Sequence, residues 1–205
     1  MMAAMDYLLT PVQKALKEAI KGFVALEVPP LRATAAPDKE IVEALVLKLG
    51  EFLREREERP EIDGGVPLSG VETVMVLEEI LKCLPAAGPE PTAARLFGGL
   101  SPELRSSAAS LGSARGLLAP CFGRAFGRSG PEASGHDCGA LDQELADVLT
   151  AIEAARLMTY RAAILEDEGR RDPEESTEAK RQAEELASRA AVLASLIKKG
   201  EDHET

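Results

Sequence analysis

The spacing of apolar residues constrains the fold of this chain more than any other feature of its sequence. In one segment after another, apolar residues recur every three or four positions, which places them on one face of an α-helix. No stretch alternates apolar and polar residues for long, and β-branched residues are sparse. The pattern predicts an all-α fold, an antiparallel bundle of about six helices.

Capping signals mark where the first three helices begin. The residues Thr10-Pro11-Val12-Gln13 predict a capping box at the first helix, which Pro29-Pro30 is expected to end. A second helix is expected from about Asp38. Ser69 and Glu72 predict a second capping box, at the start of a third helix.

The second half of the chain predicts three further helices. Ser101-Pro102-Glu103 opens a fourth helix that is expected to end near Pro120, and the Gly- and Ser-rich residues 123–139 predict a long loop. A fifth helix is expected from about Leu141 to Gly169.

A last helix is expected to begin at Asp172-Pro173 and to end at Gly200. A short turn joins the last two helices, so they are expected to pack antiparallel.

Composition narrows the class of protein. The chain has 205 residues, of which 45% are apolar, enough for one domain with a real core, and its formal net charge of −11 argues against nucleic-acid binding. No apolar run reaches the ~18 residues of a membrane span. The three cysteines are far apart and form no CxxC motif, which favours a reduced, cytoplasmic compartment. The trio His136-Asp137-Cys138 is isolated, so no metal site is expected.

Several segments, in the right order, resemble the helices of acyl-CoA dehydrogenases. In the C-terminal half, "IEAARLMTYRAA" (152–163), preceded by "LADV" (145–148), resembles a helix of that family's C-terminal domain. The neighbouring helices are matched by "AASLGSARGLL" (108–118) with "RAFGR" (124–128), and by "EAKRQAEELASRAAVLA" (178–194). In the N-terminal half, similar segments are "MDYLLTPVQKALKEAIKGFV" (5–24), "LVLKLGEF" (45–52) and "DGGVPLSGVETVMVLEEI" (63–80).

The resemblance implies a shortened member of the family. A β-barrel separates the helical parts of the family, but only residues 83–99 join them here, too few for several strands of about five residues plus turns. The family's C-terminal flavin-binding loop is expected to be missing too, because the sequence stops at "KKGEDHET". We therefore expect an N-terminal helical part (1–84), a short linker (85–99), a C-terminal bundle part (100–200) and a disordered tail (201–205).

The resemblance also implies candidate site residues. The family removes an α-proton from an acyl-CoA with a carboxylate while a hydride passes to flavin. Glu103 is the candidate base, and Arg124, Phe126 and Gly127 are candidate flavin contacts. A simpler interpretation makes Glu103 a partner of its helix dipole and Arg124 a solvated or carbonyl-capping residue. Arg156 and Tyr160, four residues apart, are expected to pack inside the bundle.

Two classes of function follow. The first is a small subunit resembling the family, not catalytic alone, that assembles with itself or with a full-length acyl-CoA dehydrogenase paralogue, and with electron-transfer flavoprotein as a further candidate partner. FAD is then implied by the resemblance but not expected to be bound by this chain alone. The alternatives are a reduced FAD-dependent dehydrogenase, with a substrate slot between the third, fourth and fifth helices, or a ligand-free structural bundle.

Overall fold

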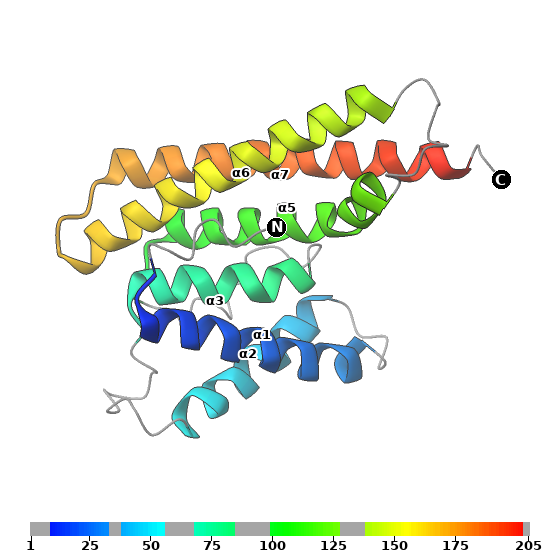
Figure 1. Ribbon diagram of the computed structural model, residues 1–205. Helices are drawn as coiled ribbons and strands as arrows, with labels where there is room; N and C mark the ends of the chain where they lie inside the picture. Colours follow the sequence, from blue (N-terminus) through cyan, green and yellow to red (C-terminus); the bar gives the residue numbers. More distant parts are fainter. Residues whose placement is uncertain (1–8, 33–37, 56–67, 85–98, 128–137, 203–205) are drawn as a thin grey trace.

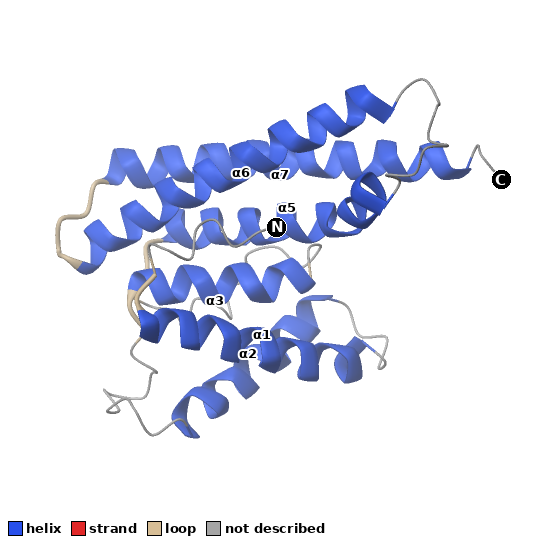
Figure 2. Cartoon of the chain, in the orientation of Figure 1, coloured by secondary structure: helices blue, strands red, loops and turns tan. Residues whose placement is uncertain are grey.

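The computed structural model describes residues 9–32, 38–55, 68–84, 99–127 and 138–202. These residues form six α-helices and no strand (Figure 2), so the predicted all-α bundle is confirmed. The predicted linker (85–99) lies outside them apart from Gly99, and so do residues 203–205 of the predicted tail. The helices are α1 (Pro11–Arg32), α2 (Asp38–Glu55), α3 (Gly70–Cys83), α5 (Pro102–Gly127), α6 (Cys138–Asp167) and α7 (Pro173–Asp202).

The helices are stacked, with α6 and α7 at one side, α5 and α3 in the middle, and α1 and α2 at the other side (Figure 1). Apolar side chains form two clusters. The larger one joins α1, α2 and α3 to the first half of α5 and the last part of α6. The smaller one lies between α5, α6 and α7. Burial of these apolar surfaces is the main driving force for packing the helices.

Helix α3 is the central element. It begins with the predicted capping box, in which Ser69 accepts a hydrogen bond from the Glu72 backbone and the Glu72 side chain accepts one from Ser69. The residues from Gly70 to Leu81 are all buried. The sequence indicated one apolar stripe, but neighbours on several sides cover α3, so its charged residues are buried as well.

The relative directions of the helices follow from side-chain contacts. Ion pairs between Arg161 and Glu175 (3.0 Å) and between Arg189 and Glu144 (2.8 Å) confirm the antiparallel packing of α6 and α7. By contrast, α3 and α5 run in the same direction (Figure 1).

Several helix boundaries differ from the predicted ones. Helix α1 continues through Pro29 and Pro30 to Arg32, and α5 continues through Pro120 to Gly127. Proline removes one backbone donor, but its fixed φ is compatible with a helix. Just beyond these prolines, Leu31 packs against the larger apolar cluster and Cys121 belongs to the smaller one. The predicted loop (123–139) is therefore wrong at both ends, because its first five residues belong to α5 and Cys138 already begins α6.

The ends of the last two helices also depart from the prediction. Helix α6 ends at Asp167, and Gly169 follows in the left-handed region at φ 69°. The Arg170 backbone N–H donates to the Leu165 carbonyl and that of Gly169 donates to Glu166, which is a Schellman motif. Helix α7 does not end at Gly200, since it continues to Asp202.

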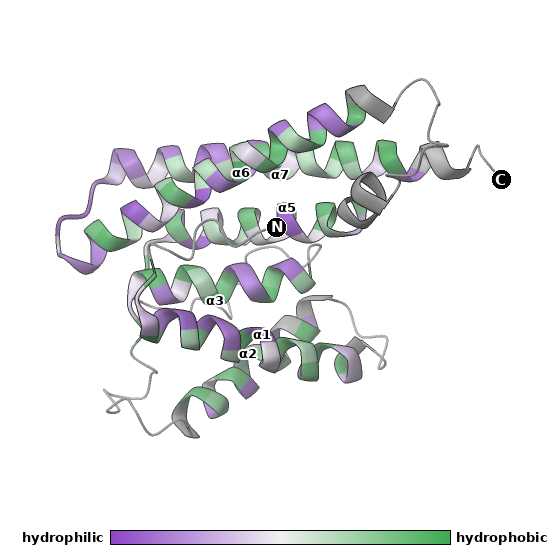
Figure 3. Cartoon of the chain, in the orientation of Figure 1, coloured by the Kyte–Doolittle hydropathy of each residue, from purple (hydrophilic) through white to green (hydrophobic). Residues whose placement is uncertain are grey.

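The C-terminal end of α6 also fastens the starts of two other helices. Asp167 accepts hydrogen bonds from the backbone N–H groups of Gly70 (2.6 Å) and Val71 (3.4 Å) of α3. Glu166 accepts one from the Ser101 backbone, directly before α5 (2.8 Å). Two consecutive carboxylates thus satisfy helix N-termini far away in the sequence. The turn that follows them is strongly hydrophilic (Figure 3).

Candidate functional site

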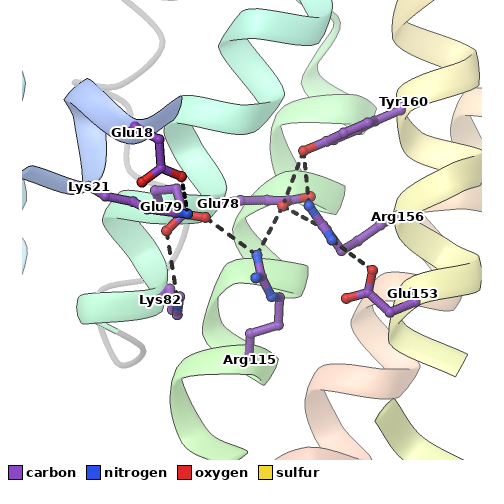
Figure 4. Close-up of polar contacts among 9 residues, drawn as sticks. All are labelled: Glu18, Lys21, Glu78, Glu79, Lys82, Arg115, Glu153, Arg156 and Tyr160. Atoms are coloured by element: carbon purple, nitrogen blue, oxygen red, sulfur yellow. Dashed lines mark hydrogen bonds and ion pairs between the residues drawn. The ribbon is translucent and has the colours of Figure 1, made fainter. Parts of the chain in front are cut away.

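A network of buried charged side chains lies where α3, α5 and α6 meet (Figure 4). Its centre is Glu78 of α3, which is only 1% exposed. Arg115 of α5 and Arg156 of α6 both approach its Oε2 atom, with Nη1 of Arg115 at 3.3 Å and Nε of Arg156 at 2.8 Å. One carboxylate therefore connects three helices.

Arg156 extends the network along α6. Its Nη1 donates to Oε2 of Glu153 at 2.7 Å, and its Nη2 donates to the Tyr160 hydroxyl at 3.2 Å. The guanidinium carbon also lies 5.4 Å from the centre of the Tyr160 ring, within cation–π range. Spacings of three and four residues place the three side chains on one helix face. Arg156 and Tyr160 thus pack inside the bundle, as expected.

Arg115 extends the network toward α1. Its Nη1 atom lies 3.7 Å from Oε1 of Glu79, whose Oε2 lies 3.7 Å from Nζ of Lys82. The network therefore contains equal numbers of acidic and basic side chains. Within the described part of the chain, Glu78 Oε1, Glu79 Oε1 and Arg115 Nε are buried without a hydrogen bond. Charge is balanced here, but the hydrogen-bonding capacity is not fully used.

The electrostatic environment keeps two of these groups in one protonation state. Burial alone would lower the pKa of the Arg156 guanidinium, but the surrounding Glu78, Tyr160 and Glu153 raise it above its ordinary value. Burial raises the pKa of the Tyr160 hydroxyl, and Glu78 raises it further. A general acid or base has to titrate near the working pH. Arg156 and Tyr160 are therefore suited to holding helices together rather than to transferring protons.

Helices α3 and α5 touch backbone to backbone beside this network. A Cβ atom at Gly112 would lie 2.7 Å from the carbonyl oxygen of Glu78, and one at Gly116 would lie 2.2 Å from that of Lys82. Only glycine permits so close an approach. The glycine contacts and the Glu78 network thus lie between α3, α5 and α6, where the alternative of a reduced dehydrogenase placed its substrate slot.

Glu103, the candidate base, lies in the first turn of α5, and its side chain is 34% exposed. Its Oε2 atom lies 3.2 Å from Nη2 of Arg171. An acidic side chain in the first turn interacts favourably with the helix dipole. This geometry agrees with the simpler interpretation of Glu103.

The candidate flavin residues Arg124, Phe126 and Gly127 lie in the last turns of α5, and their side chains are outside the described part. Arg124 follows Glu103 by roughly 31 Å along the helix, at about 1.5 Å per residue. The structure therefore does not bring the candidate base and the candidate flavin contacts together.

The backbone around the candidate flavin residues differs from the loop that the resemblance implies. The resemblance implies flavin contacts from a loop around Arg124, Phe126 and Gly127, whereas their backbone is helical, and the N–H groups inside a helix are bonded within it. No group of three or more His, Cys, Asp and Glu side chains that could hold a metal ion occurs in the described residues, which exclude His136 and Asp137.

Sequence reasoning missed Glu78 and Arg115 as partners of Arg156. The available signal was a pair of adjacent glutamates, Glu78 and Glu79, inside the apolar run "VMVLEEIL" of the third helix. A buried charge is strongly unfavourable unless it is paired, so such residues predict cationic partners on neighbouring helices. The sequence offers no comparable signal for which arginines would provide them.

The described chain is thus a helical domain whose centre is closed by glycine contacts and by ion pairs. The family described as acyl-CoA dehydrogenase, C-terminal domain, matches residues 104–197, a little less than half of the chain, which covers α5, α6 and most of α7. This match supports membership of the acyl-CoA dehydrogenase family and bears out the resemblance drawn from the C-terminal half of the sequence. No curated protein and no solved structure matches the chain. None of the described helices is both long and apolar enough to cross a membrane.

Proposed function

We propose that this chain is an assembly subunit of a flavin-dependent acyl-CoA dehydrogenase complex and is not catalytic alone. The observation that carries the proposal is the closed centre between α3, α5 and α6. Gly112 and Gly116 bring two helix backbones into contact, and Glu78 draws Arg115 and Arg156 into the remaining space. A chain that acts on an acyl-CoA by itself needs room for the substrate beside a base.

The outer faces of the C-terminal helices support the assembly role. Leu157 and Ile164 of α6 are 38% and 47% exposed and stand seven residues apart, and Val192 and Leu196 of α7 are also exposed. Large apolar side chains at helical spacing on an outer face are typical of surfaces that other subunits cover. The proposed partner is a full-length acyl-CoA dehydrogenase paralogue or a second copy of this chain.

In this proposal the full-length paralogue supplies the FAD and the catalytic carboxylate, and the complex passes electrons to electron-transfer flavoprotein. The complex would work in fatty-acid metabolism in the cytoplasm, a compartment suggested by cysteine usage. Glu103 and Arg124 would then lie at opposite ends of α5, where each could contact a partner rather than a reacting carbon in this chain.

The test is native affinity purification of the tagged full chain from its own cells, with flavin absorbance measured on the eluate. We expect a yellow eluate that contains an acyl-CoA dehydrogenase and oxidises acyl-CoA. Ile164→Arg should reduce the recovered flavin several-fold, because it places a charge in the apolar face, whereas Arg181→Gln changes an already polar surface and should have no effect. A colourless eluate without any flavoprotein would contradict the proposal.

A further inference from the structure

We draw no further inference here: the strongest candidate, the buried side-chain cluster of Glu78, Arg115 and Arg156 between α3, α5 and α6, belongs to the site already described, where its charges are paired with one another.

Discussion

Replacing Glu78 with glutamine should destabilise this protein more than any other single change of charge. Glu78 is buried and holds Arg156 at 2.8 Å and Arg115 at 3.3 Å, so Glu78→Gln leaves two buried guanidinium groups without their shared counter-charge. Breaking a buried ion pair costs about 3–5 kcal/mol. This loss is a large part of the stability of a typical domain, which is about 5–15 kcal/mol. In a chain of this size it corresponds to a melting temperature lower by roughly 6–20 °C.

Two comparisons separate this network from ordinary surface pairs. Glu144→Gln removes a half-exposed carboxylate 2.8 Å from Arg189 and should change the free energy of unfolding by less than about 1 kcal/mol. Replacing Glu78 with Leu together with Arg115→Met and Arg156→Met removes the central carboxylate and both buried arginines, while Glu79 keeps Lys82 at 3.7 Å. This triple variant should be less destabilised than Glu78→Gln, because it leaves no buried guanidinium group without a counter-charge. Urea denaturation followed by circular dichroism measures all three. If Glu78→Gln behaves like Glu144→Gln, the network is not what holds the three helices together.

Three further predictions concern other contacts. Gly116→Ala should lower the free energy of unfolding by about 1–3 kcal/mol, because its Cβ would lie 2.2 Å from a backbone oxygen of α3. Gly22→Ala should raise it by about 0.5–1 kcal/mol, because its Cβ meets no neighbour within 4 Å and alanine favours a helix. Denaturant unfolding of both variants measures the contrast. Asp167→Ala removes the acceptor at the start of α3 and should cost about 0.5–2 kcal/mol in the same assay, with faster amide hydrogen exchange at Gly70 and Val71. Burial raises the pKa of the Tyr160 hydroxyl, so the stability that the buried neutral tyrosine contributes is complete below the unfolded pKa of about 10 and is lost as the pH rises beyond it. The protein has two tyrosines, and in an alkaline absorbance titration Tyr160→Phe should abolish the tyrosinate step that occurs at the higher pH. Loss of the step at the lower pH instead would contradict the burial of Tyr160.

Local signals in the sequence were sufficient for most of the helices. The capping box of Ser69 and Glu72 marked the start of α3 correctly, because both side chains bond to a backbone only three residues away. The prolines were misleading. Pro30 and Pro120 each weaken a helix locally, but α1 and α5 continue through both of them. Tertiary packing outweighs local preference in both helices.

The buried network could not be derived from the sequence because burial is a property of the assembled helices. Glu78 looks like one charge on an amphipathic helix until α5 and α6 cover it. The buried position of Arg156 was predicted correctly, because two of its partners, Glu153 and Tyr160, are close to it on the same helix. The contact across α3 and α5 depends on Gly112 and Gly116, and nothing in the sequence specifies which helix those glycines face.

The most direct test of the account is size-exclusion chromatography of the purified full chain, with light scattering and visible absorbance recorded together. The account predicts a colourless peak at a mass of two or more 21.8 kDa chains, and no oxidation of acyl-CoA with an artificial electron acceptor. A yellow peak with one FAD per chain that oxidises acyl-CoA by itself would contradict the central claim that this domain has the scaffold of a dehydrogenase without independent catalysis.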